Sequence, residues 1–430
     1  HPPVKGVPGA QSSGAYLVSF NAEAFCSYGQ GVAGKGLNAP VSQERAFAYT
    51  TALNDLLRRD SGHKIQLGET TVVFWAEKDT PFETVLPAMF GGNRDTGGLS
   101  EAARARLDDA LQRIEKGLDP VDDLSDAEAG LRFYILGLAA PSQARLTVRF
   151  WLVTTLGHLL TAIRDHVAAV RIEKRYDTDF EVPTLWGLVR ETAQDREIDR
   201  AASGLQSRLL NAVLTGAPYP VGLLAMALNR IRAECGSKRS TQDLVNHNRA
   251  ALIKAALTRP SGSGASGHVG EEITMSLNPN SEKIGYQLGR LFAVLEKVQK
   301  DAHSGGPTEG GEKPKQNANL NRTIRDSFFA TAIAAPARVF PHLIVKAEYH
   351  ISRIRRNEPR FADKAEKNIG DILEHLDVET KGFPQTMTQT EQGHFVLGYY
   401  HQRNALYRKT GQGKPDAPES DTQTTEEEAA

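Results

Sequence analysis

The sequence has few cysteines and no long apolar segment. Among its 430 residues only Cys26 and Cys235 are cysteines, which are too few for a disulfide framework or a zinc ribbon. No run of about 18 apolar residues occurs, so a transmembrane helix is not expected. No charged segment followed by an apolar one marks a signal peptide at the start of the sequence. These absences favour a cytoplasmic protein with reduced thiols.

Neither sign of charge predominates. Lys and Arg number 51 and Asp and Glu number 52, which gives a net charge of −1. The charges are nevertheless segregated, because acidic residues cluster at 119–128 and in the tail. Between residues 320 and 360, eight basic residues stand against only Asp326, Glu348 and Glu358. A basic surface for nucleic acid is therefore compatible with the neutral total.

Residue patterns typical of catalysis are also missing. The segment that comes closest to a catalytic motif is GQGVAGKG at 29–36, which resembles a phosphate-binding P-loop. Gly36 stands where a hydroxyl residue should hold magnesium, and Pro40 follows where the phosphate-binding helix should begin. We interpret the segment as a flexible loop that offers Lys35 to a nucleic-acid backbone; a nucleotide-hydrolysing enzyme is the alternative. The histidines have no metal-ligand spacing, so we expect neither catalysis, nor a metal, nor a cofactor.

The first part of the chain combines strand and helix patterns. Ser42 is a helix cap, and Phe47 and Leu53 are predicted to face inward from the helix that follows. Strands are predicted at 16–20, 64–67, 70–75, 131–139 and 145–153, and helices at 42–59, 99–116 and 156–170. This order predicts a small, mainly antiparallel sheet backed by helices.

After about residue 183 only helical spacing remains. Helices are predicted at 185–193, 205–214, 221–231, 245–257, 281–299, 320–334, 336–355, 363–377 and 390–408, with polar linkers at 261–270 and 304–319. The fold class is therefore α+β. The predicted domains are an α/β domain at 1–180, a helical connector at 181–260, a C-terminal helical bundle at 270–410 and a disordered tail at 411–430.

Two segments have the composition of a binding surface. Residues 5–14 are rich in small residues, which let backbone amides approach a phosphate, and they carry Lys5, Gln11, Ser12 and Ser13. An ordinary surface loop is the alternative. In the predicted helix at 336–355, basic residues recur at helical spacing beside apolar ones that can serve the core, namely Leu343, Val345, Ile351 and Ile354. Here the alternative is a solvated charged face.

Longer stretches resemble a known family. They are GAQSSG at 9–14, LVSFN at 17–21, NAPVS at 38–42, AFAYTTALN at 46–54, TTVVFWAE at 70–77, FYILGL at 133–138, RLTVRFW at 145–151, GYQLGRLFAVLEK at 285–297, TIRD at 323–326 and EQGHFVLGYYHQR at 391–403. In this order they resemble the large-subunit family of the type I-C CRISPR surveillance complex (Cascade) over essentially residues 1–409. The family normally carries a further N-terminal region, which we expect to be missing from this sequence.

The resemblance implies a non-catalytic subunit of a crRNA-guided complex in antiviral defence. Its partners would be the crRNA-bearing backbone and cap subunits, a small subunit that the C-terminal helical portion resembles, the target double-stranded DNA with its displaced strand, and a helicase-nuclease recruited after R-loop formation. In such complexes RNA pairing reads the sequence, and protein reads a short adjacent motif, the PAM. A scaffold whose basic helices bind only proteins is a further alternative.

The resemblance and the composition together give the site residues that we predict. For the PAM-adjacent duplex they are Lys5, Gln11, Ser12, Ser13, Asn21, Lys35 and Asn38. For the phosphates of the displaced strand they are Arg322, Arg325, Arg338, Lys346, Arg353, Arg355 and Arg356.

Overall fold

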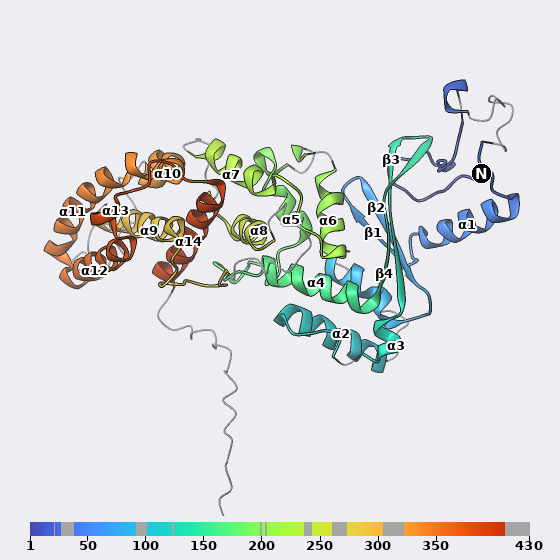
Figure 1. Ribbon diagram of the computed structural model, residues 1–430, viewed down its shortest axis with the longest axis horizontal. Coiled ribbons are helices and arrows are strands. Elements are labelled where there is room, and N and C mark those ends of the chain that lie inside the picture. Colours follow the sequence, from blue (N-terminus) through green and yellow to red (C-terminus); the bar gives the residue numbers. More distant parts are fainter. Residues whose placement is uncertain are drawn as a thin grey trace, which may run out of the picture.

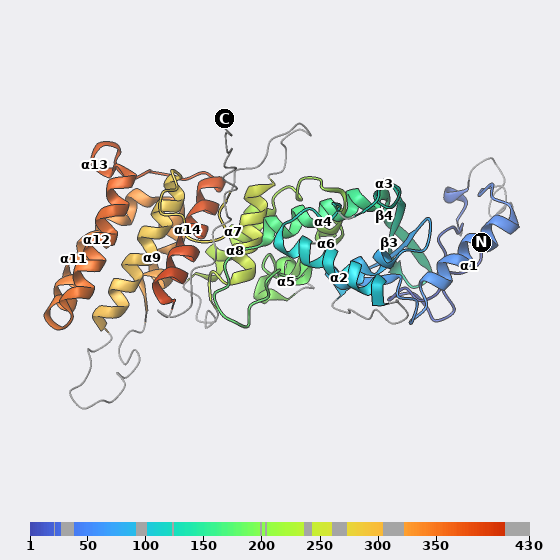
Figure 2. The same cartoon turned by 90° about the horizontal axis from the view of Figure 1, so that it is seen from below.

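A computed structural model describes residues 1–20, 22–26, 38–91, 101–122, 124–197, 200–202, 204–235, 243–259, 273–303 and 322–408. The molecule is elongated, with a β-sheet near the N-terminus at one end and a helical bundle at the other (Figure 1). The same succession is visible from below (Figure 2), where α8 lies between the sheet and the bundle. The predicted α+β class is confirmed.

The sheet has four strands in the order β1-β2-β3-β4, and every pair is antiparallel. The strands are β1 (Lys64–Leu67), β2 (Thr70–Ala76), β3 (Arg132–Ser142) and β4 (Arg145–Thr155). Gly68, at a φ of +59°, makes the tight turn between β1 and β2. The strand predicted at 16–20 is wrong: only Tyr16 forms a bridge, to Arg145, and the chain then bends away from β4. A short apolar run specifies no strand unless a sheet edge runs beside it.

Helices and the N-terminal segment cover the two faces of the sheet. On one face lie α4 (Leu156–Val170), α2 (Glu101–Lys116) and α6 (Leu205–Thr215), whose buried residues share a core with Phe74 and Phe133. On the other face, Val4 and Val7 pack with Leu53 of α1 (Gln43–Leu56) against the strands. The Ser42 side chain caps α1 as predicted, by accepting a hydrogen bond from Arg45 N.

One residue of α1 does not point where the sequence analysis placed it. Phe47 is 65% exposed, whereas Ala46, Thr50 and Leu53 are the buried residues of this helix. Phe47 follows Ala46 and so lies about 100° further round the helix, away from the sheet. The prediction that Phe47 faces inward is therefore wrong.

The middle of the molecule is organised around α8 (His247–Thr258), which packs against α4, α5 (Leu185–Arg190), α7 (Leu223–Glu234) and α14 (Gln389–Tyr407). Its Arg249 is fully buried and forms ion pairs with Glu191 at 2.9 Å and Glu234 at 2.8 Å. Lys254 Nζ donates to the carbonyl of Ala168 near the C-terminus of α4, at 2.8 Å. The buried apolar side chains form one continuous core from the sheet into the bundle. The predicted domain bounds stay predictions.

The bundle contains α9 (Ile284–His303), α10 (Ile324–Ala334), α11 (Phe340–Asn357), α12 (Pro359–Leu376), the short α13 (Val378–Lys381) and α14. Glycines let α9 and α14 approach closely, since a Cβ on Gly289 would lie 2.0 Å from the Phe395 carbonyl oxygen. The rings of Phe292, Phe329 and Phe395 fill the space beside this contact. The predicted helices are confirmed here, whereas the linker at 304–319 and the tail at 411–430 lie outside the described residues.

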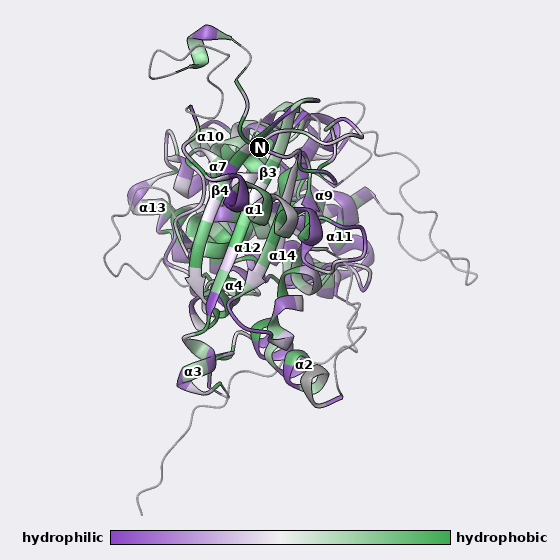
Figure 3. Ribbon diagram, turned by 90° about the vertical axis from the view of Figure 1, so that its right-hand side faces the viewer, coloured by the Kyte–Doolittle hydropathy of each residue, from purple (hydrophilic) through white to green (hydrophobic). Residues whose placement is uncertain are grey.

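Hydropathy follows this arrangement. The strands are coloured mostly as hydrophobic, whereas α11 on the outside of the bundle is mostly hydrophilic (Figure 3). In the part of the chain that the structure describes, no helix combines the length and the apolar character needed to cross a bilayer.

Candidate nucleic-acid interface

The first candidate surface is a loop formed by residues 4–15, which we call the opening loop. Val4 and Ala15 close it by exchanging two backbone hydrogen bonds of 2.8 Å. Gly14 has a φ of +99°, and a Cβ there would lie 2.9 Å from a Pro3 carbon, so only glycine fits. The loop rests on the β3–β4 hairpin through the backbone amide of Gln11, which donates to the Gln143 backbone carbonyl at 2.9 Å.

The opening loop brings four of the predicted residues together. Lys5, Gln11, Ser12 and Ser13 are all exposed, and a Cβ on Gly14 would lie 3.1 Å from Lys5 Cγ. Within the described residues, the backbone amides of Ser12 and Ser13 have no hydrogen-bond partner. The loop therefore offers amides, hydroxyls and one ammonium group, which are the donors that proteins use to contact phosphate and sugar oxygens.

The other residues predicted for the duplex are placed less clearly. Gln11 also has a structural role, because its side-chain amide donates to the Gly14 carbonyl at 3.0 Å and closes a turn. Asn38 is half-buried and has interactions of its own just before α1. Asn21 and Lys35 lie outside the described residues, as does the P-loop-like segment at 29–36.

The second candidate surface lies at the other end of the molecule, and we call it the α11 surface. It consists of Arg338, in the turn before α11, and of five residues on the helix: His342, Lys346, Tyr349, Arg353 and Arg356. All six are exposed and none is acidic. At 3.6 residues per turn, the five on the helix fall within about 100° of arc.

The opposite side of α11 faces the bundle. Its buried residues are Phe340, Leu343, Ala347, Ile351 and Ile354. Val345, which the sequence analysis assigned to the core, is 66% exposed and borders the α11 surface, so that prediction is wrong. An apolar residue at helical spacing can lie just outside the buried stripe, and only the neighbouring helices fix where the stripe ends.

Two predicted arginines are not part of the α11 surface. Arg355 lies on the side of α11 that faces α12, where its guanidinium is 2.5 Å from Glu366 and 3.5 Å from Asp363. The side chain of Arg325 is 16% exposed and pairs with Asp243 at 3.6 Å and Asp326 at 3.3 Å. Both guanidinium groups already have carboxylate partners, so we do not include them in the interface.

A pocket opens beside the α11 surface, between the end of α9, the start of α10 and α11. It encloses about 510 Å³, and both Arg322 and Lys346 line it. Its walls include Phe328 and Tyr349, which the sequence analysis did not select. Tyr349 stands three residues after Lys346 and four before Arg353, and this helical spacing was the signal that could have revealed it.

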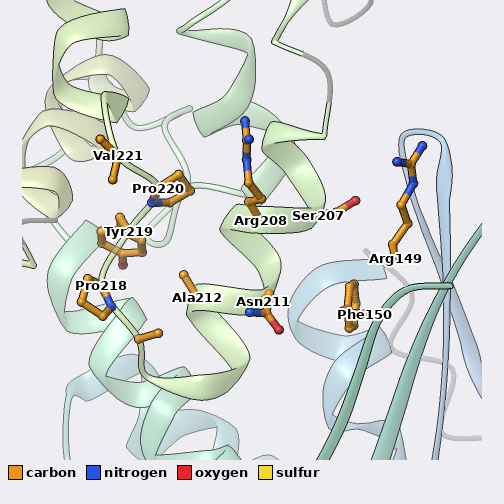
Figure 4. A pocket seen from close by; sticks show the side chains of 11 residues that line it. Arg149, Phe150, Ser207, Arg208, Asn211, Ala212, Pro218, Tyr219, Pro220 and Val221 are labelled. Carbon is orange, nitrogen blue, oxygen red and sulfur yellow. The ribbon is translucent and has the colours of Figure 1, made fainter. Parts of the chain in front are cut away.

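A second cavity, of about 410 Å³, lies between β4, α6 and residues 217–221 (Figure 4). Figure 4 shows Ser207 between Arg149 and Arg208, the two cations that line this cavity. The wall is fixed, because the Tyr219 hydroxyl is 2.8 Å from His166 Nδ1 and the Arg259 guanidinium lies over the Tyr219 ring at 4.5 Å. Burial raises the pKa of Tyr219 to about 12 and lowers the pKa of His166 to about 3, so both are neutral at neutral pH.

No motif in the sequence could have indicated this cavity, because its two arginines are far apart in the chain and are brought together by the packing of α6 beside β4.

Within the described ranges, no group of three or more His, Cys, Asp or Glu residues could hold a metal ion.

Comparison with known proteins identifies the family. The search of curated proteins found no match. The family model described as CRISPR-associated protein (Cas_Csd1) matches residues 1–407, which include the opening loop, the sheet, the middle helices and the bundle. Since the match extends over most of the chain, the protein belongs to this family of CRISPR-associated proteins.

Proposed function

We propose that the chain is the large subunit of a type I-C crRNA-guided DNA-targeting complex and that it acts by binding rather than by catalysis. The observation that carries this proposal is the match of residues 1–407 to the family of CRISPR-associated proteins. It is supported by the two exposed surfaces at opposite ends of an elongated molecule, one rich in amides and hydroxyls and one basic (Figure 1).

The opening loop contacts duplex DNA next to the PAM in this proposal. The backbone amides of Ser12 and Ser13, which have no partner among the described residues, suit phosphate oxygens, and Lys5 adds a positive charge beside them. Contacts of this kind fix the position of a protein on DNA. The bases of the PAM would then be read by side chains at the edge of the loop, such as Gln11.

The α11 surface holds the displaced strand. A single strand exposes both phosphates and bases, and proteins bind it with cations along the backbone and aromatic rings for the bases. Lys346, Arg353 and Arg356 provide the cations, and Tyr349 provides a ring that is 71% exposed. Once the displaced strand is held, the complex with its backbone, cap and small subunits recruits the helicase-nuclease.

The test is an electrophoretic mobility shift of target duplex by reconstituted complex, with and without this subunit, at two salt concentrations. We expect the shift to require the subunit and a correct PAM, and to weaken at high salt. Equal binding without the subunit would contradict the proposal and would leave a scaffold that binds only proteins.

The opening loop is tested with the triple variant Lys5→Gln, Ser12→Ala and Ser13→Ala in the same assay. We expect weaker binding of duplex with unchanged binding of single-stranded DNA. Lys78→Gln is the control for the lost charge, because Lys78 is exposed and follows the C-terminal end of β2, outside the opening loop. The absence of catalysis is tested separately, by incubating the wild-type subunit with ATP or with DNA; turnover of either would refute a purely binding role.

A further inference from the structure

The pocket beside the α11 surface has features that phosphate binding alone does not explain. Phosphates of a strand can be neutralised on an open surface, yet here a cavity of about 510 Å³ lies at the edge of the basic stripe. This volume falls within the range of about 300–1,000 Å³ that small-molecule sites occupy. We propose that the pocket takes up a single unstacked nucleotide of the displaced strand, an inference that rests on the proposed function.

The charge of the lining favours an anionic ligand. Arg322 and Lys346 line the pocket, and no Asp or Glu is among the lining residues. Neither cation has a carboxylate partner within the described part of the chain. Lys346 Nζ lies 5.9 Å from the centre of the Phe328 ring, where the ring attracts the ammonium group. The ammonium group is thus held at the pocket while its charge stays available to a phosphate.

The walls favour a planar ring next to that phosphate. Tyr349, which is 71% exposed, contacts His350 with ring centres 5.9 Å apart. His350 in turn contacts His303, with centres 5.2 Å apart, and Phe328 lies on the neighbouring helix α10. A base stacked on such rings gains affinity whatever its sequence, because every base has a π face. Leaving most of the Tyr349 ring in water costs free energy that a stacked base would recover.

Polar groups in the pocket match the edge of a base. The Gln299 side-chain oxygen accepts from Ile324 N at 2.8 Å, which leaves the amide NH₂ as a donor. His303 Nδ1 donates to the Gln299 backbone carbonyl at 2.8 Å, which leaves Nε2 as the ring nitrogen that can bond to a ligand. Ser327 adds an exposed hydroxyl. The amide, the ring nitrogen and the hydroxyl can each bond to the edge of a base, whereas an acidic peptide would leave the ring walls unused.

The test compares a normal single-stranded oligonucleotide with one of equal length in which the bases are replaced by abasic sites, both bound by the 430-residue chain. The phosphate number is the same, so the ratio of the two affinities measures base contacts alone. Stacking of one base contributes about 1–3 kcal/mol, and we expect the normal strand to bind the wild type at least about fivefold more tightly. Tyr349→Ala should remove most of that ratio, and Tyr349→Trp should retain it.

Controls separate the pocket from the surrounding surface. Phe361→Ala removes a ring that is 59% exposed on α12, and we expect it to leave the ratio unchanged. Lys346→Gln should weaken both strands equally. Tight binding of both strands without a preference for bases would refute the nucleotide pocket and leave the proposed function intact. No binding of either strand at low salt would overturn strand holding by α11 and this site with it.

Discussion

Replacing Lys346, Arg353 and Arg356 together by glutamine tests the α11 surface quantitatively. The three side chains are exposed, lie on one side of α11 and have no carboxylate partner in the described ranges. Each phosphate that they neutralise releases counterions, so the logarithm of the affinity for a single strand falls by about 0.7 per logarithmic unit of salt. Because the variant neutralises three fewer phosphates, its slope should be less steep by about 2.

The measurement is fluorescence anisotropy of a labelled single-stranded oligonucleotide at several salt concentrations. Over a fourfold rise in salt, the wild-type affinity should fall about twentyfold more than that of the triple variant. The loss of affinity should be similar for unrelated sequences, because phosphate contacts carry no sequence information. Since the three residues are exposed, thermal unfolding should show nearly the same stability for both proteins.

A matched control removes the same charge from a neighbouring helix. Arg360, Lys364 and Lys367 are exposed and lie on one side of α12, but Asp363 and Asp371 share that side. The mixed charge there should hold no phosphates, so the glutamine triple on α12 should leave the salt slope unchanged. An unchanged slope in the α11 variant, or an equal change in the α12 control, would refute the reasoning.

Two further predictions concern stability. Gly289→Ala should destabilise the protein by about 1–3 kcal/mol in urea unfolding, because the new Cβ would lie 2.0 Å from the Phe395 carbonyl oxygen. The control is Gly370→Ala on α12, where the new Cβ meets no atom within 4 Å and should stabilise the protein by about 0.5–1 kcal/mol. Equal changes in unfolding free energy for the two variants would contradict close packing of α9 and α14. Burial lowers the pKa of His401, whose Nδ1 is 2.9 Å from the Tyr286 hydroxyl, to about 3. As the pH falls below about 6.5, the unfolded state therefore takes up a proton that the folded state does not, and stability decreases. His401→Gln should reduce the loss of unfolding free energy between pH 7.5 and pH 5.5 by about 1.4 kcal/mol, and an unchanged loss would show that this imidazole does not cause it.

Much of the local structure was predictable because it depends on neighbouring residues. The Ser42 cap, the hairpin with its turn at Gly68, and the long amphipathic helices follow from side-chain hydrogen bonds, backbone freedom and apolar spacing. The same spacing predicted that Arg338, His342, Lys346 and Arg353 would form a basic stripe with Arg355 and Arg356 at its end, and of these only Arg355 lies elsewhere on the helix. The opening loop was predictable from its small and hydroxyl residues, although Gln11 proved to be partly structural.

What the sequence alone determined, therefore, is the order of strands and helices, the α+β class, the resemblance to the family, and the two segments that could carry a nucleic-acid surface. Only the tertiary structure decided which residues of those segments face solvent. It paired Arg355 with Glu366 and Arg325 with Asp243, and it exposed Phe47 and Val345. It also brought the end of α9, the start of α10 and the middle of α11 together around one pocket. The reason is physical: periodicity gives the side of a helix on which a residue lies, but exposure and charge pairing depend on which other helices pack against that side.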